Sequence, residues 1–367
     1  MSQFMSDLAS YMQACSAAFN ARSLETLYAY TNTPDVIAER DRSWIKRKWL
    51  AMAVRLGARR LVFDRDEMQQ ITSWGSGLDD TYRLLADDHS RRILIEVMAY
   101  RLLGPAKVKL SRNDEQYRRF FDAIPVIARQ RQTVKINLLG GWLDRYDLDR
   151  LGYPIEADLH HLNILYTFQL EQYRYDRDGV VVEARPGDIA IDGGGCWGDT
   201  ALYLAQRVGP TGHVHSFEPS PDNLPVFEAN LQRNAELASR ISVHRNALWK
   251  VSDAELSFDP KGPATSVGGT GAATVRSLAI DDLIERKSVP RVGFIKMDIE
   301  GAELDALRGA ERTIRAQRPR LAVTLYHRLG DFVTIPRFLN ELELGYRLYI
   351  DHFSIKREET VLFAIVD

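Results

Sequence analysis

The 367 residues are enough for two domains, and 45% hydrophobic with 27% charged residues is the composition of an ordinary globular protein. A formal net charge of −2 provides no general basic field, so we expect no nucleic-acid partner. The two cysteines, Cys15 and Cys196, indicate no disulfide framework, which favours a reducing, cytoplasmic location. The sequence opens without a secretory-signal pattern and has no uncharged apolar run of about 18 residues, so we expect no membrane span.

Residues 1–165 are predicted to form a mainly helical N-terminal domain. The clearest helix is expected at 86–103, which has capping residues before it and a glycine-proline pair after it. A second, amphipathic helix is expected at 43–56. His160 and His161 are adjacent, so on a regular element their side chains point in different directions, and we do not expect them to bind a metal together.

A strand, a glycine-rich turn and a helix follow one another at 189–208. The apolar run 189–191 has the length of a strand that is buried on both faces. The glycines at 193–195 and Gly198 allow the backbone to turn sharply and to approach a ligand closely. Residues 200–208 then carry apolar side chains at helical spacing. Together they predict the first unit of a nucleotide-binding α/β sheet.

Two kinds of ligand fit such a turn. The dinucleotide fingerprint is matched from Gly193 to Gly198, and Glu218 lies where a ribose-binding acid belongs. However, Asp192 precedes the glycines and Asp199 follows them. Two unit charges about 4 Å apart interact by about 4 kcal/mol at an effective dielectric of about 20. These carboxylates therefore disfavour a pyrophosphate and favour S-adenosylmethionine, which carries an ammonium and a sulfonium group and no phosphate.

Strands and helices continue to alternate after the turn. We expect strands at 212–217, 241–248, 291–298, 320–327, 346–350 and 360–366, helices at 221–234, 303–317 and 332–344, and a hairpin at 254–258 with a mobile glycine-rich loop at 261–271. This alternation predicts a doubly wound, mostly parallel α/β sheet over residues 166–367.

Ligands of such sheets bind beyond the carboxyl ends of the strands, at the switch point of the strand order. Glu218 is predicted to accept both hydroxyls of a ribose there. Asn246 and the backbone of Ala247 would face an adenine edge, although a simple turn asparagine explains Asn246 equally well. The predicted cofactor-binding residues are Asp192, Gly193, Gly194, Gly195, Trp197, Gly198, Asp199, Thr200, Glu218, Pro219, Ser220, Asn246 and Ala247.

Four segments in order resemble the successive motifs of FkbM-type methyltransferases. They are Asp-Gly-Gly-Gly-Cys-Trp-Gly-Asp-Thr at 192–200, Phe-Glu-Pro-Ser-Pro at 217–221, Lys-Met-Asp-Ile-Glu-Gly-Ala-Glu at 296–303 and Tyr-His at 326–327. The resemblance covers about residues 170–367. It implies a class I, Rossmann-like fold, S-adenosylmethionine as cofactor, and O-methylation of a hydroxyl on a sugar, glycan or polyketide-type small molecule. One departure from the family pattern is Cys196-Trp197 in the turn.

Methyl transfer to a hydroxyl needs a base near the sulfonium methyl group. We predict His327 or Asp298 in that role, because each follows a strand of the sheet. Lys296 and Glu300 are predicted to bind the acceptor or to orient the base. A structural histidine and a carboxylate that favours the start of a helix are the simpler explanations of His327 and Glu300. Two carboxylates without further ligand spacing do not indicate a metal site.

Three other functions remain open from the residues alone. An NAD(P)-dependent oxidoreductase or epimerase would use the turn from Gly193 to Gly198, although no obvious Tyr-x-x-x-Lys pair follows it. An N-methyltransferase acting on a peptide or amide nitrogen would use the same methyl donor. A catalytically silent binding module would carry out no reaction at this turn. Residues 1–165 are predicted to shape the acceptor pocket or to support a homo-oligomer.

Overall fold

The computed structural model describes residues 2–21, 65–105, 107–136, 141–259, 266–267, 273–287 and 289–366. The helix expected at 43–56 lies outside these residues, as does the loop expected at 261–271 except for 266–267. The chain divides into two compact units, one of residues 1–121 and 350–360 and one of residues 122–349 and 361–367. This division differs from the boundary expected near residue 165.

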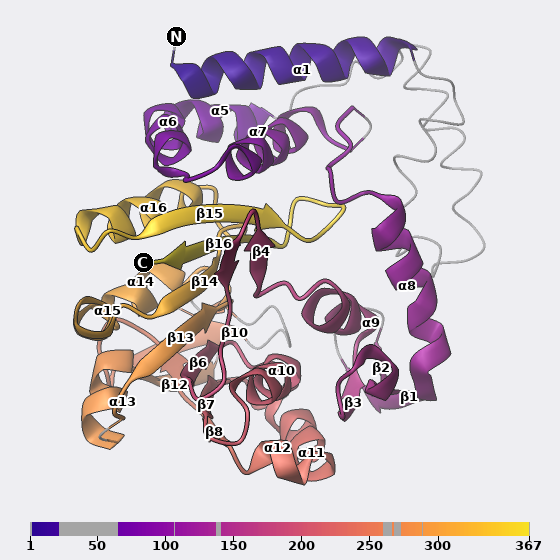
Figure 1. Cartoon of the computed structure of the whole chain (residues 1–367), viewed down its shortest axis with the longest axis vertical. Coiled ribbons are helices and arrows are strands. Elements are labelled where there is room, and N and C mark those ends of the chain that lie inside the picture. The colour runs from indigo at the N-terminus through magenta and orange to yellow at the C-terminus, as the bar shows by residue number, and fades with distance from the viewer. Residues whose placement is uncertain are drawn as a thin grey trace. The chain divides into compact units, whose positions relative to one another are not determined.

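Helices make up most of the described part of the first unit. They are α1 Gln3–Ala21, α5 Arg65–Ser73, α6 Gly75–Leu84 and α7 Asp88–Leu103, and α8 Glu115–Ile127 contains the boundary between the units. α7 begins where the Asp87 carboxylate accepts a hydrogen bond from the backbone N–H of Ser90 (2.7 Å), and it ends at Gly104. α7 packs against α1 (Figure 1). The helix expected at 86–103 is confirmed.

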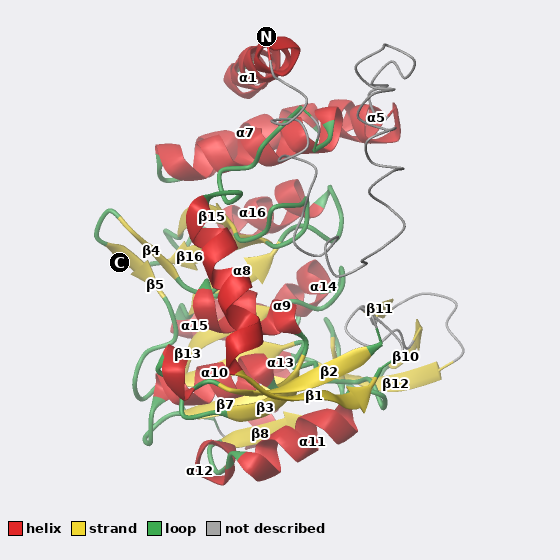
Figure 2. Ribbon diagram, turned by 90° about the vertical axis from the view of Figure 1, so that its right-hand side faces the viewer, coloured by secondary structure: helices red, strands yellow, loops and turns green. Residues whose placement is uncertain are grey.

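Residues 122–165 are less helical than expected. They contain an antiparallel sheet of β1 Ala128–Lys135, β2 Trp142–Asp147 and β3 Glu156–Leu159, which run side by side (Figure 2). β1 is polar and largely exposed, so its sequence carries no clear strand pattern. At the free edge of β3, the backbone N–H of Asp158 donates to Asn230 Oδ1 (2.8 Å) and that of Glu156 to Asn234 Oδ1 (3.0 Å). These bonds attach the small sheet to the segment that contains Asn230 and Asn234 within the same unit.

The central sheet has seven strands in the order β15-β16-β14-β13-β6-β7-β8 (Figure 1). Their bounds are β6 Ile189–Gly193, β7 His213–Phe217, β8 Ile241–His244, β13 Val292–Met297, β14 Arg320–Thr324, β15 Arg347–His352 and β16 Thr360–Ile365. The strands from β8 to β14 are parallel, and β16 is antiparallel to β14. The chain runs from β6 outward to β8 and returns to β13 on the other side of β6, so the switch point lies between β6 and β13. The doubly wound, mostly parallel sheet is confirmed.

The remaining elements of the second unit connect or flank this sheet. The helices are η1 Asp149–Leu151, α9 His161–Asn163, η2 Ile164–Gln169, α10 Asp199–Val208, α11 Leu224–Arg233, α12 Ala235–Ala238, α13 Ile280–Lys287, α14 Glu303–Arg308, α15 Glu311–Gln317 and α16 Asp331–Glu341. β4 Tyr175–Arg177 and β5 Val180–Val182 pair with each other, and a separate sheet has the order β11-β10-β12-β9, with β9 Ala247–Leu248, β10 Glu255–Asp259, β11 Ser266–Val267 and β12 Ala273–Leu278.

Three expected elements are shorter than their patterns indicated. The helix expected at 303–317 is broken at Gly309, where the carbonyl of Trp249 leaves no room for a Cβ. The strand expected at 241–248 ends at His244, because residues 247–248 pair with β12 instead. The strand expected at 320–327 ends at Thr324, which leaves His327 in the following loop.

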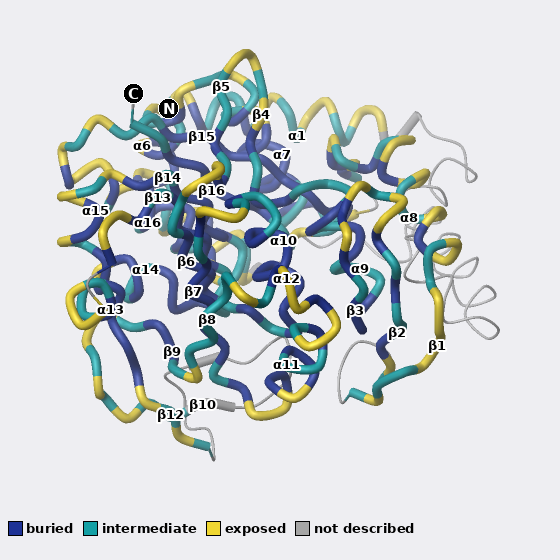
Figure 3. The backbone as a smooth tube through the Cα atoms, turned by 60° about the horizontal axis from the view of Figure 1, so that its bottom comes forward, coloured by how far each residue is buried: buried dark blue, intermediate teal, exposed yellow. Residues whose placement is uncertain are grey.

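The middle of the central sheet forms the core of the second unit. Ile191 in β6 and Phe294 and Met297 in β13 are 0% exposed. Figure 3 shows β6 in the colour of buried residues and much of β1 as exposed. Among the described helices, none combines the length and the apolarity that a membrane crossing requires.

Candidate active site

The turn after β6 requires glycine. Gly194 and Gly198 have φ values of +85° and +88°, which residues with a side chain rarely adopt. A Cβ at Gly194 would overlap the carbonyl oxygen of Asp298, and one at Gly198 would overlap the ring of Phe227. The backbone N–H of Asp298 also donates to the carbonyl of Gly193 (3.0 Å). Glycine therefore allows the end of β6 to contact the end of β13, at the switch point.

Several backbone donors of the turn are already occupied. The N–H groups of Gly194 and Gly195 both donate to the carbonyl of Phe217, at 3.0 and 2.9 Å, and that of Cys196 donates to Glu218 Oε2 at 2.7 Å. A pyrophosphate needs such N–H groups unbonded and directed at it. The turn therefore fits a dinucleotide poorly, which removes the support for the oxidoreductase alternative.

A buried ion pair holds the turn. Asp192 and Lys296 are 0% and 1% exposed, and Lys296 Nζ lies 3.1 Å from Asp192 Oδ1. The same ammonium donates to the carbonyls of Gly193 (2.9 Å) and Gly194 (2.8 Å). Burial lowers the pKa of Lys296, but the carboxylates of Asp192, Asp298 and Asp199 together outweigh burial and raise it, so the amine is charged. These contacts use all three N–H groups of Lys296, so Lys296 supports the turn. The contact with an acceptor that the sequence suggested for Lys296 is therefore not available.

Asp192 has further partners besides Lys296. Thr200 Oγ1 donates to Asp192 Oδ1 (2.9 Å), and Ser216 Oγ donates to Asp192 Oδ2 (2.7 Å). All these groups are buried. Asp192 and Thr200, both predicted to bind the cofactor, therefore shape the turn from behind it.

The negative charge of Asp199 is also compensated, by hydrogen bonds from two side chains. Its carboxylate accepts hydrogen bonds from Thr167 Oγ1 (2.8 Å) and Asn163 Nδ2 (3.0 Å), and burial raises its pKa. Since Asp192 is neutralised by Lys296, neither acid is the bare charge that the sequence argument assumed. These paired charges therefore do not disfavour a pyrophosphate, contrary to our expectation. The occupied backbone N–H groups of the turn disfavour it instead.

Glu218 follows β7 and its carboxylate lies against the turn. Oε2 accepts from the N–H of Cys196 and Oε1 from the N–H of Ser220, both at 2.7 Å. Burial raises the pKa of Glu218 to about 7, and hydrogen bonds from Ser220, Asn223 and Cys196 limit the rise. These three hydrogen bonds leave one of the four lone pairs of the carboxylate free, so the group can still accept a ribose hydroxyl.

The other predicted cofactor residues differ in their surroundings. Trp197 is 1% exposed and belongs to the core. Pro219 is partly exposed next to Glu218. Asn246 Nδ2 donates to the carbonyl of Arg276 (3.1 Å), and Ala247 pairs with β12 in the separate sheet. These contacts agree with the turn-asparagine explanation of Asn246.

Two tyrosines hold the carboxylate of Asp298, directly after β13. Tyr173 donates its hydroxyl to Asp298 Oδ2 (2.8 Å), and Tyr326 donates to Oδ1 (3.1 Å). The Asp298 side chain is 18% exposed. Lys296 Nζ lies 5.0 Å from the centre of the Tyr173 ring. Tyr173 therefore contacts both the ion pair under the turn and the carboxylate next to it.

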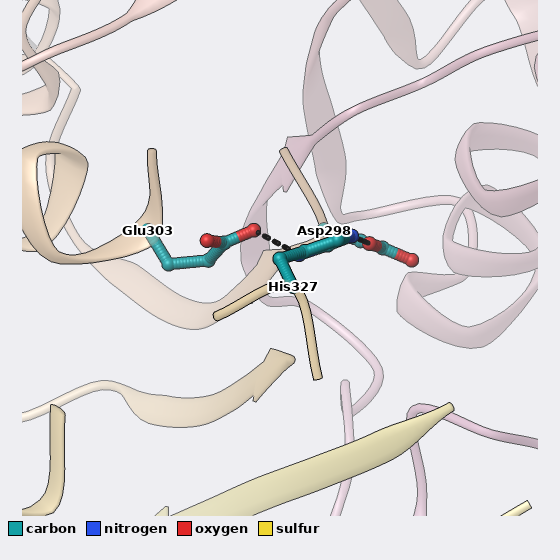
Figure 4. Close-up of side chains that lie close together, drawn as sticks. All are labelled: Asp298, Glu303 and His327. Carbon is teal, nitrogen blue, oxygen red and sulfur yellow. Dashed lines mark ion pairs between the residues drawn. The ribbon is translucent and has the colours of Figure 1, made fainter. Parts of the chain in front are cut away.

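His327 lies among three carboxylates. Its Nδ1 is 3.0 Å from Glu303 Oε1, and its Nε2 is 3.4 Å from Asp298 Oδ1 and 3.5 Å from Glu300 Oε2. Figure 4 shows the ring between Glu303 and Asp298. Burial lowers the pKa of His327, but Glu303, Glu300 and Asp298 outweigh burial and raise it well above its ordinary value. Burial raises the pKa of Glu303, and His327 reverses this and lowers it.

The structure brings Asp298, Glu300 and His327 together, as the sequence predicted, and adds residues that were missed. Glu303 was part of a quoted motif, which was the available signal, but it received no role. Tyr173 precedes β4, and no local pattern connects it with a carboxylate so far along the chain. Its place in the cluster follows from the tertiary structure alone.

Comparisons with known proteins agree with this geometry. Residues 179–348 match the family model of the methyltransferase FkbM domain. The hexuronic acid methyltransferase AglP of Haloferax volcanii is 26% identical over 167 residues, which are 44% of this chain and 66% of that protein, slightly less than two thirds of its length. The 31-O-demethyl-FK506 methyltransferase FkbM of Streptomyces tacrolimicus is 25% identical over 202 residues, 45% of this chain and 76% of that protein.

A solved structure shares the fold. The methyltransferase FkbM from Methylobacillus flagellatus KT matches with a TM-score of 0.52 and 21% identity, over 81% of this chain and 60% of that chain. At this identity the likeness establishes the fold. Over residues 179–348 the chain is therefore similar to the FkbM methyltransferase domain, and it shares the Rossmann-like fold of the solved FkbM structure.

Proposed function

We propose that this protein transfers a methyl group from S-adenosylmethionine to a hydroxyl of a sugar, glycan or polyketide-type small molecule. One observation carries the proposal: the N–H of Asp298 donates to the carbonyl of Gly193 (3.0 Å). This bond joins the glycine turn, where the methyl donor binds in our proposal, to a polar cluster suited to an acceptor. Donor and acceptor sites on adjacent strand ends are what a direct transfer between them requires.

The relatives suggest the class of acceptor. One is named for a hexuronic acid and another for an oxygen of the macrolide FK506. Both acceptors carry alcohols. The proposal for this chain follows that shared chemistry and does not choose between the two.

On the donor side, we assign the ribose to Glu218, whose Oε2 also accepts from the N–H of Cys196 in the turn. Lys296 holds the carbonyls of Gly193 and Gly194. Asp192, Asp199 and Thr200 fix the shape of the turn.

On the acceptor side, we assign the base to Asp298. The alcohol oxygen attacks the methyl carbon in line with the carbon–sulfur bond, the bond to sulfur breaks, and the hydroxyl proton moves to the carboxylate. Tyr173 and Tyr326 fix the orientation of that carboxylate. A positioned base contributes typically 10²–10⁴-fold to such a reaction, and the in-line placement contributes further.

The setting of the enzyme is also part of the proposal. Cys15 and Cys196 form no disulfide, which supports a cytoplasmic location, where the methyl donor is made. The N-terminal residues would shape the acceptor pocket or support a homo-oligomer. A small-molecule or glycan acceptor, and no nucleic acid, is the expected partner.

Calorimetric titration with S-adenosylhomocysteine and, separately, with NAD⁺ tests the donor. We expect binding of S-adenosylhomocysteine and none of NAD⁺. Tighter binding of NAD⁺, with no S-adenosylhomocysteine bound up to millimolar concentration, would overturn the proposal. Labelled methyl transfer to uronic acids, hexoses and macrolide alcohols, with NMR of the product, then tests the acceptor. A methylated nitrogen would favour the N-methyltransferase alternative instead.

A further inference from the structure

Two buried polar atoms of the acceptor cluster have no hydrogen-bond partner. They are His327 Nε2 and Glu303 Oε2. The side chain of His327 is 7% exposed and that of Glu303 is 0% exposed, so neither atom is hydrated at an open surface. An unsatisfied buried polar atom is costly, and it often marks a site for an ion or water.

The donor atoms around His327 have the spacing of metal ligands. One ligand atom from each of Asp298, Glu303 and His327 lies within 4.8 Å of the others (Figure 4). His327 Nε2 is 3.4 Å from Asp298 Oδ1 and 3.5 Å from Glu300 Oε2. Two atoms that each lie about 2.1 Å from one ion, at the tetrahedral angle, are about 3.4 Å apart. His327 Nε2 therefore lies at the spacing of metal ligands from one oxygen of each of two carboxylates.

We propose that His327 Nε2, Glu300 and Oδ1 of Asp298 bind a divalent transition-metal ion, that Oδ2 of Asp298 remains the base assigned above, and that Glu303 is a positioning residue for the ring. From the sequence we expected no metal here, because Asp298 and Glu300 alone are two carboxylates. The fold adds the imidazole of His327 from the loop after β14 and a third carboxylate, that of Glu303, from α14.

Glu303 is placed to hold the imidazole for a metal. Its Oε1 lies 3.0 Å from His327 Nδ1 and also accepts from the backbone N–H of Ile299 (2.8 Å) and Gly301 (3.3 Å). Histidines that bind metals usually donate the other ring N–H to a carboxylate in this way. Glu303 therefore holds the proton on Nδ1, so that loss of the second ring proton on metal binding leaves the lone pair on Nε2. It also fixes the loop that carries Glu300.

Charge and ligand type indicate which ion fits. Three carboxylates, those of Asp298, Glu300 and Glu303, surround the ring of His327. A proton on the ring offsets one of their negative charges, and a divalent ion offsets two. Metal binding displaces that proton, which is released to solvent. Imidazole with carboxylates suits Mn²⁺, Fe²⁺ or Zn²⁺ better than Ca²⁺ or Mg²⁺. Three protein ligands leave a coordination position for an oxygen of the acceptor.

The test measures Mn²⁺ binding to the full chain after chelator treatment, by calorimetry and by the electron paramagnetic resonance signal of Mn²⁺. We expect one ion per chain. His327→Gln should abolish tight binding, Glu300→Gln should weaken it at least about tenfold, and Glu303→Gln should weaken it about 10- to 100-fold, the range seen when such orienting groups are lost. A parallel titration with Zn²⁺ should show the same order of variants.

The controls separate a lost site from a lost fold. Asp281→Asn changes a carboxylate that is 9% exposed and accepts from the backbone N–H groups of Arg312 and Thr313, away from the cluster, so it should bind Mn²⁺ like the wild type. S-adenosylhomocysteine binding reports folding of each variant. No Mn²⁺ or Zn²⁺ bound to the wild type, or binding unchanged in His327→Gln, would overturn the metal site while leaving the methyltransferase proposal intact. Metal binding without any S-adenosylhomocysteine binding would do the reverse.

Discussion

The two sides of the proposed active site are built differently. On the donor side, Asp192, Lys296 and the glycine carbonyls are buried and use their hydrogen-bonding capacity on one another. On the acceptor side, Asp298 and Glu300 are 18% and 28% exposed. The buried ring of His327 retains a nitrogen that no hydrogen bond satisfies.

This contrast separates a preformed site from an incomplete one. A turn whose groups are all paired has one shape before the donor arrives, so little reorganisation is needed on binding. The acceptor cluster, in contrast, has bonding capacity left for a substrate oxygen or an ion. Mutations should therefore affect stability and donor binding on one side and turnover on the other.

The sharpest test of this division is Asp298→Asn. It keeps the size of the side chain but removes the proposed base, so kcat should fall by about 10²–10⁴-fold. The affinity for S-adenosylhomocysteine should change little. Methyl transfer from S-adenosylmethionine and calorimetry measure the two quantities, with Asp281→Asn as the control. Equal losses of turnover and of donor affinity would mean that the two sides are not separate.

Lys296→Met should have the next largest effect, on stability. It leaves the Asp192 carboxylate buried without its cation, and breaking such a pair by removing one partner costs about 3–5 kcal/mol. The free energy of unfolding from urea titration measures this. The double variant Asp192→Leu/Lys296→Met should lose less than the sum of the single variants. Additive losses would contradict a coupled pair beneath the turn.

The raised pKa of Glu218 predicts that the stability of the folded protein depends on pH. Its pKa is raised from 4.5 to about 7 in the folded protein, so the folded state holds this proton more tightly than the unfolded chain. Its contribution to stability is therefore fully present below about pH 4.5 and is lost as the pH rises to about 7, a change of about 2–3 kcal/mol.

The ribose should bind the ionised carboxylate of Glu218. S-adenosylhomocysteine affinity should consequently rise about tenfold from pH 6 to pH 8, opposite in direction to the stability of the ligand-free protein. Calorimetry and thermal unfolding across this range measure both slopes. Glu218→Gln should flatten them. If the slopes persist in that variant, another group is responsible.

The smallest expected effect is that of Tyr173→Phe. The ring near Lys296 is kept, but one hydrogen bond to the Asp298 carboxylate is lost, which is worth about 1.5–3 kcal/mol when the acceptor is charged. Tyr326 still holds the other oxygen, so we expect a decrease in kcat of about tenfold. Donor affinity should be unchanged in calorimetry. A loss of donor affinity instead would place Tyr173 with the turn.

Local patterns predicted much of the fold. The strand, turn and helix from residue 189 to 208 appear as expected, because an apolar run, glycines and helical spacing lie next to one another in the sequence. The helix at 303–317 was predicted too long, because its break at Gly309 depends on the carbonyl of Trp249 from a distant segment. The small sheet before residue 165 was missed, because β1 is polar and exposed.

The sequence predicted where the candidate site residues lie in the fold better than it predicted their roles. Glu218, Asp298 and His327 lie at or near strand ends, as the rule for such sheets required. Lys296 was read as an acceptor contact because nothing in its own segment reveals that its ammonium meets Asp192 across the switch point. The nearly continuous burial along β13 does not indicate which partner each side chain contacts.

The sequence by itself determined the class I sheet, the glycine turn and the strand-end residues, since each depends on neighbours close along the chain. Only the tertiary structure decided which charges are paired. It placed Lys296 on Asp192, Tyr173 on Asp298, and three carboxylates around His327. The physical reason is that electrostatic interactions depend on distance and burial in space, and the segments that carry these groups are far apart in the chain.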